Sequence, residues 1–222
     1  MSVEFDGDVA VITWNDVENR IHRESLASLH AILDELQART GPLAVVLTGT
    51  GKFFSNGVDL VNFGHDLDEL RAIFKELHRT IARLVVYPAY TVGALNGHTF
   101  AGGALIACAL DHRVMREDRG FWCMNEADIG LPLDEKLSAI LFNRLPRASA
   151  IEAMLTARRY GGPDARAAGM VEEVASESDV LARAVAVAGA MAGKDRAVLA
   201  KHKRLAHRAL VTTLGYPEFL EA

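Results

Sequence analysis

A run of apolar, mostly β-branched residues from Leu43 to Thr48 constrains the fold of this chain most strongly. Gly41-Pro42 and Gly49 bound the run, a pattern typical of a strand buried on both faces of a parallel sheet. Before it, apolar residues recur at helical spacing between Leu26 and Leu36, and residues 3–14 read as a β-hairpin. A helix between two strands predicts a parallel, right-handed crossover, so we expect an α/β fold.

The same arrangement of strand, glycine-containing loop and helix occurs twice. The first strand leads into the glycine-rich loop Gly49 to Leu60 and then into helical spacing from Leu67 to Leu84. The second, Tyr90 to Leu95, leads into the stretch Asn96 to Ala104 and an apolar helical run that ends at Leu110. Because open α/β sheets bind ligands at loops that follow their strands, these two loops are the first candidates for a site.

The pair Gly102-Gly103 stands between the second buried strand and its helix. Paired glycines there allow backbone N–H groups to approach a ligand, and the helix dipole favours negative charge at that point. The spacing matches neither a dinucleotide motif nor a phosphate loop. The pair is also consistent with close helix packing, and the local pattern leaves both interpretations open.

Charge and cysteine usage limit the classes of partner. The formal net charge is -5 and the pI is near 5.9, which argue against a nucleic-acid binder. The one basic cluster, Lys201 to Arg204, is either a solvated helix face or a contact for a phosphorylated ligand. Cys108 and Cys123 lie among apolar residues, so we expect buried, reduced thiols.

Targeting and metal motifs are also missing from the sequence. It has no metal-ligand spacing, signal-peptide pattern, peroxisomal tripeptide or membrane-length apolar window. We therefore expect a cytoplasmic protein without membrane partners and without a metal.

The predicted secondary structure changes in character near residue 134. Residues 112–115 and 121–124 predict two more strands, and the loop 125–132 carries two carboxylates. Beyond it the chain is mostly helical, with one short strand predicted at 170–174. We expect an α/β core over residues 1–134 and a helical C-terminal region over 135–222, together forming one structural unit.

Both glycine-containing loops resemble the signature segments of the crotonase superfamily, the enoyl-CoA hydratases and isomerases. The similarity rests on Phe54 to Leu60 and on Asn96 through Gly103, and it continues through Asp111-His112-Arg113 and Glu126 to Leu131. It covers the chain from Val9 to about Leu205. The resemblance implies a spiral of repeated ββα or βαβ units followed by a helical region that packs in trimers.

The resemblance also implies an oxyanion site for a thioester. Its two N–H donors, carried over by position, are Val58 and Gly102, and such donors act on charge that develops in the transition state. The substrate is expected to be an acyl-CoA, with no cofactor beyond the coenzyme A that the substrate itself carries. The residues expected to contact the substrate are Phe54, Asn56, Gly57, Asp59, Leu60, Gly103, Leu105 and Ile129.

In the family that the chain resembles, the number of catalytic carboxylates differs from one reaction to another. A hydratase that resembles the family's best-known members uses two glutamates to hold and activate water. In this chain the position of the first glutamate is taken by Leu105, and the position of the second is Glu126. A single glutamate in an Asn-Glu context resembles the monofunctional Δ3,Δ2-enoyl-CoA isomerases, in which one base moves a proton from C2 to C4. Apolar neighbours such as Phe121, Trp122 and Leu105 are expected to raise the pKa of Glu126.

Alternatives remain for several polar residues. The alternative role of Glu126 is that of a structural carboxylate, and the alternative candidate for the base is Asp128. Asp59 is expected to cap a helix or loop. Asp111 and Arg113 are expected to form a structural pair. His98 is expected to pack within its loop, with contact to the acyl chain or coenzyme A as the second interpretation.

Isomerisation of 3-enoyl-CoA to 2-trans-enoyl-CoA is the leading function, in fatty acid metabolism. The alternatives are hydration or another acyl-CoA reaction on the same oxyanion site, and a catalytically silent acyl-CoA-binding homologue. The family pattern implies a homo-oligomer, a trimer or a dimer of trimers.

Overall fold

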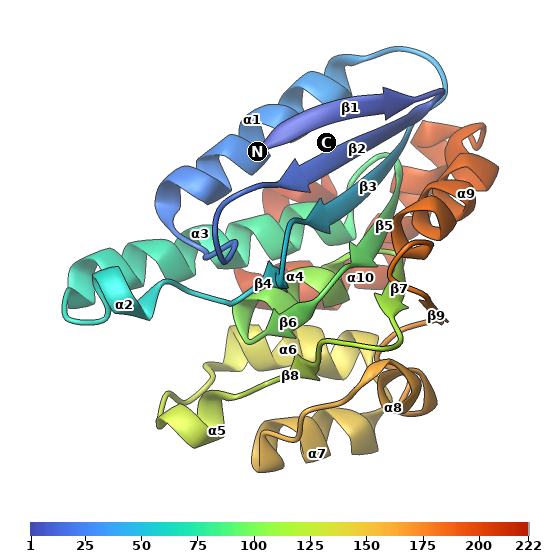
Figure 1. The fold of residues 1–222 in the computed structure, drawn as a ribbon. Coiled ribbons are helices and arrows are strands. Elements are labelled where there is room, and N and C mark those ends of the chain that lie inside the picture. The colour runs from blue at the N-terminus through green and yellow to red at the C-terminus, as the bar shows by residue number, and fades with distance from the viewer. Residues whose placement is uncertain (222) are drawn as a thin grey trace.

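Two β-sheets organise the chain in the computed structural model, which describes residues 1–221 (Figure 1). The larger sheet has six strands in the order β1-β2-β3-β5-β7-β9. β1 and β2 pair antiparallel, which confirms the hairpin, and every other pairing in this sheet is parallel. Its strands are β1 (Ser2–Asp6), β2 (Val9–Trp14), β3 (Ala44–Gly49), β5 (Tyr90–Leu95), β7 (His112–Arg116) and β9 (Glu173–Ala175).

The smaller sheet is built from three short parallel strands in the order β4-β6-β8. These are β4 (Phe53–Ser55), β6 (His98–Phe100) and β8 (Trp122–Cys123). Two of them lie inside the segments predicted as glycine-rich loops, so that prediction was wrong in this respect. Strands of two or three residues leave little periodic signal, and pairing with one another stabilises them.

Each repeat of the chain contributes one strand to each sheet and then a helical segment. β3 and β4 with the helices α2 (Leu60–Phe63) and α3 (Leu67–Val85) form the first such unit. β5, β6 and α4 (Gly102–Ala109) form the second, and β7, β8 and α5 (Glu126–Ile129) form the third. The expected spiral of ββα units is therefore confirmed (Figure 1). Because the carboxyl ends of parallel strands share one edge, the loops that leave β4, β6 and β8 come together there.

Helices account for most of the remaining chain, as predicted for its last third. They are α1 (Arg23–Ala38), α2 (Leu60–Phe63), α3 (Leu67–Val85), α4 (Gly102–Ala109), α5 (Glu126–Ile129), α6 (Glu135–Arg144), α7 (Arg147–Thr156), α8 (Gly162–Ala167), α9 (Val180–Ala192), α10 (Arg196–Leu214) and a 3₁₀ turn, Pro217–Leu220. Two boundaries differ from the prediction. α5 forms within the expected loop 125–132, and β9 begins at Glu173, three residues later than the expected strand.

Both faces of the large sheet are covered. All six residues of β3 are buried, as the apolar run predicted. Val46 packs toward α9, together with Ala184 and Ala188, whereas Val45 and Leu47 belong to the main core with α1, α3 and α4. None of the helices in residues 1–221 is long and apolar enough to cross a membrane.

The turns between the two sheets stack tightly on one another. The Asn96 side chain accepts from Gly49 N at 3.0 Å and donates to Gly51 O at 3.2 Å. A Cβ added at Gly97 would lie 2.2 Å from the carbonyl oxygen of Lys52. Glycine is required there because backbone of the neighbouring turn occupies the space, and the stacked turns hold the small sheet in register.

The partners of two charged residues show that one predicted pair was wrong. Asp111 and Arg113 do not pair with each other. The Asp111 carboxylate accepts from Thr91 N at 2.8 Å and contacts the Lys203 ammonium, whereas Arg113 pairs with Glu172. Asp111 immediately precedes β7 and Arg113 lies within it, and each is paired by a residue from a later part of the chain: Lys203 from α10 for Asp111, and Glu172 from the segment before β9 for Arg113.

Lys203 departs from the predicted solvated face or phosphate contact, whereas Lys201 and His202 of the same cluster are exposed as a solvated face predicts. Its side chain is buried and its Nζ donates to Ala89 O at 2.7 Å. Cys108 and Cys123 are free and buried, as predicted.

Candidate active site

A cavity of about 210 Å³ lies at the ends of β4, β6 and β8, where loops of the three units meet. Its wall is mostly apolar and brings together the two loops, the start of α5 and one face of α3. The lining residues are Arg20, Asn56, Val58, Leu60, Phe74, Leu77, Ala101, Gly102, Leu105, Asn125, Glu126, Ile129, Leu131, Pro132, Leu133 and Leu137.

Val58 lines this cavity, and both of its neighbours in sequence are hydrogen-bonded to Ile21. Val58 forms a parallel bridge with Ile21, in which Ile21 N donates to Gly57 O at 2.8 Å and Asp59 N donates to Ile21 O at 3.0 Å. In such a bridge the amide of the central residue points away from its partner. Among residues 1–221, the Val58 N–H donates to no protein acceptor.

The Gly102 amide is the second free donor. Gly102 is the first residue of α4, where a helix has no internal acceptor for its N–H. Ala101 precedes it with φ 49° and ψ -119°, a conformation that costs a non-glycine residue energy. This kink directs the chain from β6 into α4, and within the described chain the Gly102 N–H also has no protein acceptor.

The two donor loops are in contact. A Cβ added at Gly57 would lie 3.4 Å from Gly102 N, and one added at Gly102 would lie 2.8 Å from Ile21 Cδ1 and 3.6 Å from Val58 Cγ2. Gly57 also has φ +78°, which favours glycine. Both glycines are therefore needed for the close approach of the two loops.

Glu126 brings a carboxylate to the same cavity. It is the first residue of α5 and is only 7% exposed, and its Oε2 atom has no hydrogen-bond partner among residues 1–221. Burial raises the pKa of Glu126 from 4.5 to about 7, since desolvation disfavours the charged form. The direction agrees with the prediction.

The apolar surroundings of Glu126 differ in part from those expected. Leu105 lines the cavity, but Phe121 and Trp122 do not. Trp122 packs edge-on against Tyr160, and Phe121 lies against the ring of His98 at 5.6 Å between centroids. The wall near Glu126 is instead supplied by Ile129 and residues 131–133.

Four of the predicted substrate contacts do not line the cavity. Phe54 is fully buried in the main core, and Gly103 packs against Ser55, where an added Cβ would lie 2.7 Å from Ser55 Cβ. The carbonyl of Gly57 accepts from Ile21 N at 2.8 Å, and Gly57 is not among the lining residues. Asp59 caps α2 by accepting from Asn62 N at 3.2 Å, which confirms the prediction that it caps a helix or loop. Asn56, Leu60, Leu105 and Ile129 do line the cavity.

Several lining residues were not predicted. Phe74 and Leu77 lie in the predicted helix 67–84 but were not predicted to contact a substrate, and no motif was found around Arg20. Its position just after β2, at the carboxyl end of a strand, was a usable signal. Asn125 precedes α5 but makes no capping bond, and its buried Oδ1 has no partner in the part of the chain that the structure describes.

The residues given alternative roles can also be placed. Asp128 is exposed and does not line the cavity. His98 packs between Phe53 and Phe100 at centroid distances of 5.3 and 4.9 Å, as the packing interpretation predicted. Desolvation lowers its pKa. The cavity therefore combines two free amides with one desolvated carboxylate.

Comparisons with known proteins identify the family of the chain. Residues 4–216 match the model of the enoyl-CoA hydratase/isomerase family. Enoyl-CoA delta isomerase 3 of Arabidopsis thaliana is 34% identical over 184 residues, 80% of this chain and 77% of the plant protein. A putative enoyl-CoA hydratase of Thermus thermophilus is 38% identical over 189 residues, 82% of this chain and 74% of that protein.

A solved structure shows the same fold. Human mitochondrial delta3-delta2-enoyl-CoA isomerase superposes with a TM-score of 0.86 at 26% sequence identity, covering 99% of this chain and 90% of the human chain. The family match spans nearly the whole chain, and the resemblance inferred from the two glycine-containing loops is confirmed. The chain belongs to the enoyl-CoA hydratase/isomerase family of the crotonase superfamily.

Proposed function

We propose that the chain is an isomerase that converts 3-enoyl-CoA to 2-trans-enoyl-CoA with one base. One observation carries the proposal: within residues 1–221, Glu126 is the only acidic side chain that lines the cavity. Leu105, 1% exposed, occupies the position at which the family's hydratases have their other glutamate. The similarity to the plant and human isomerases supports the same assignment.

The proposed reaction moves one proton between two carbons. The Glu126 carboxylate accepts the proton from C2, and the electrons of that C–H bond form the enolate of the thioester. The N–H groups of Val58 and Gly102 donate to the enolate oxygen, whose charge is greatest at this point. Protonated Glu126 then returns the proton to C4, so the double bond ends between C2 and C3 and the carboxylate is regenerated.

The pKa of Glu126 suits both halves of this reaction. A base with a pKa of about 7 is partly ionised at neutral pH, so it can accept a proton and later release it. The unpartnered Oε2 atom leaves one oxygen free for the substrate. The step requires no cofactor beyond the coenzyme A of the substrate itself.

Hydration of 2-enoyl-CoA is the second candidate, because the Thermus thermophilus relative is named a putative hydratase. Hydration needs a placed water as the nucleophile as well as a base. The only other polar side chains in the cavity wall of the described chain are those of Arg20, Asn56 and Asn125. None of these is a carboxylate, so isomerisation is the better supported of the two.

The decisive experiment compares the protein with Glu126→Gln on a 3-enoyl-CoA and a 2-enoyl-CoA. Conjugated thioester and hydrated product are followed separately. We expect conjugation without hydration, reduced by at least about a hundredfold in the variant. Asp128→Asn, an exposed carboxylate on the same short helix, is the matched control and should keep full activity.

Three other results would contradict the proposal. Hydration that survives in Glu126→Gln would show a different reaction and a different base. Loss of activity in Asp128→Asn alone would move the base to that residue. Tight binding of acyl-CoA without any turnover would indicate a silent homologue.

A further inference from the structure

The loop 16–22 is joined to the Val58 donor loop along its whole length. Asn56 N donates to Glu18 O at 3.0 Å, and the Ile21 bridge holds Gly57 and Asp59. The Asn56 side chain adds a bond of 3.0 Å to Glu18 Oε2. The position of the Val58 amide therefore depends on a neighbouring loop far from it in sequence.

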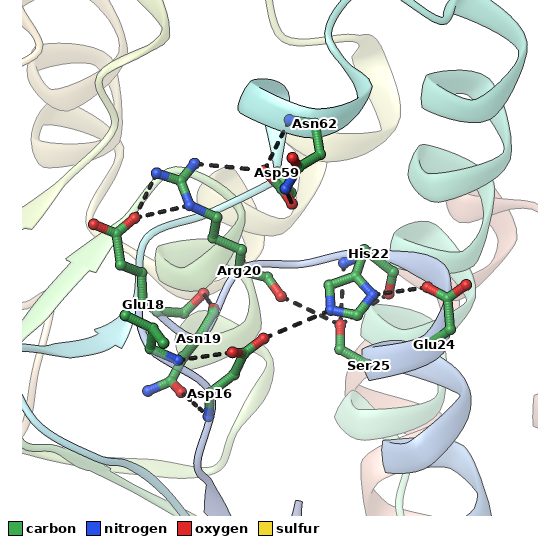
Figure 2. Close-up of polar contacts among 11 residues, drawn as sticks. Asp16, Glu18, Asn19, Arg20, His22, Glu24, Ser25, Asp59 and Asn62 are labelled. Carbon is green, nitrogen blue, oxygen red and sulfur yellow. Dashed lines mark hydrogen bonds and ion pairs between the residues drawn. The ribbon is translucent and has the colours of Figure 1, made fainter.

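Arg20 connects the same two loops through its side chain. Its Nε donates to Glu18 Oε2 at 2.8 Å, and its Nη1 lies 3.7 Å from Asp59 Oδ1 (Figure 2). Asp59 immediately follows Val58, and its side chain is only 7% exposed. Among the described residues, Arg20 is the one cation that lines the cavity.

The charge of this guanidinium is already compensated. Two carboxylates contact it, and Asp59 is held in turn by Asn62 Nδ2 at 2.6 Å (Figure 2). A cation between two carboxylates is poorly suited to bind a further anion such as a phosphate. It is well suited to fix the two segments that carry those carboxylates, because a guanidinium fork sets direction as well as distance.

We propose that Arg20 is a positioning residue for the oxyanion site. By bridging Glu18 and Asp59 it holds the peptide between Gly57 and Val58, so that the Val58 N–H points at the thioester oxygen. The inference rests on the proposed function, in which Val58 is a donor. Loss of Arg20 should weaken stabilisation of the enolate and leave binding of the ground-state thioester largely intact.

The test uses Arg20→Met, with turnover of a 3-enoyl-CoA and the enolate of bound acetoacetyl-CoA as two readouts. Since displacement of a catalytic group by about 1 Å costs about a hundredfold, we expect kcat to fall roughly ten- to a hundredfold while KM changes less than about threefold. The near-ultraviolet absorbance of the bound acetoacetyl-CoA enolate should fall together with kcat. Arg20→Lys should restore part of kcat and part of the enolate absorbance. The restoration is partial because a lysine ammonium reaches only one of the two carboxylates at a time.

Arg23→Met is the matched control, since Arg23 lies nearby but pairs with Glu69 at 3.4 Å outside the cavity. It should change neither readout. Asp59→Asn, which keeps the capping acceptor and loses the charge, should reproduce the Arg20→Met effect and serves if that variant does not fold.

The possible failures are distinguishable. A rise in KM with kcat and enolate absorbance unchanged would overturn the inference and show that Arg20 binds the substrate directly. Unchanged kcat and enolate absorbance in Arg20→Met and Asp59→Asn would overturn it while leaving the proposed function standing. A wild-type protein that neither isomerises 3-enoyl-CoA nor enolises acetoacetyl-CoA would overturn both.

Discussion

Glu126→Gln should make the protein more stable at alkaline pH even as it removes the proposed base. Burial raises the pKa of Glu126 from 4.5 to about 7, so between these values the folded protein binds more protons than the unfolded chain. The free energy of unfolding of the wild type therefore falls as pH rises through that window. Glutamine carries no charge and escapes this loss.

The raised pKa sets the size of the effect. A rise from 4.5 to about 7 corresponds to about 3 kcal/mol when fully developed, of which about 2.5 kcal/mol develops between pH 5 and pH 8. With a side chain only 7% exposed, little of this is lost to solvent screening. The value is an upper limit, because relaxation around the charge reduces it.

Urea unfolding of both proteins at pH 5 and pH 8 measures this difference. Comparing the two pH values cancels any change in packing that glutamine causes at both. We expect the variant to gain about 1 to 2.5 kcal/mol relative to the wild type on going from pH 5 to pH 8. An equal difference at both pH values would refute a desolvated carboxylate at this position.

Two further predictions concern the base and the stacked turns. The kcat/KM of the wild type should rise with pH with an apparent pKa of about 7, reaching about a tenth of its plateau at pH 6; a profile flat from pH 5 to pH 8 would remove Glu126 as the titrating base. Gly97→Ala should lower the free energy of unfolding by about 1 to 3 kcal/mol in urea, because its Cβ would lie 2.2 Å from Lys52 O. Gly193→Ala, with no atom within 4 Å of the added Cβ, should change it by less than about 0.5 kcal/mol, and equal effects of the two substitutions would contradict the steric account.

The long elements of the fold were predictable because each carries its own local signal. β3 is a run of six buried residues, and α3 repeats apolar residues at helical spacing over five turns. β4 and β6 carry no comparable signal, since three residues become a strand only by pairing with a neighbour, whereas β8 lies within the strand predicted at residues 121–124. Their stacking depends on contacts such as Asn96 with Gly49, which the order of residues does not reveal.

Some residues of the candidate site could likewise be predicted from the sequence, and others could not. Val58, Gly102 and Glu126 were placed by motif, and the structure brings all three to one cavity. Arg20 was missed because its partners, Glu18 and Asp59, belong to loops that meet only in the folded chain. Asp111 and Arg113 were paired by proximity in sequence, although their partners come from α10 and from the segment before β9.

Transfer of an isotope label tests the central claim of one-base isomerisation most directly. A 3-enoyl-CoA deuterated at C2 is converted by the wild type in ordinary water, and the product is examined by mass spectrometry and NMR at early turnover. A single base that carries the proton from C2 to C4 predicts 2-enoyl-CoA with part of the deuterium at C4. Product with no deuterium at C4 from the first turnovers, or hydrated product in its place, would contradict the account.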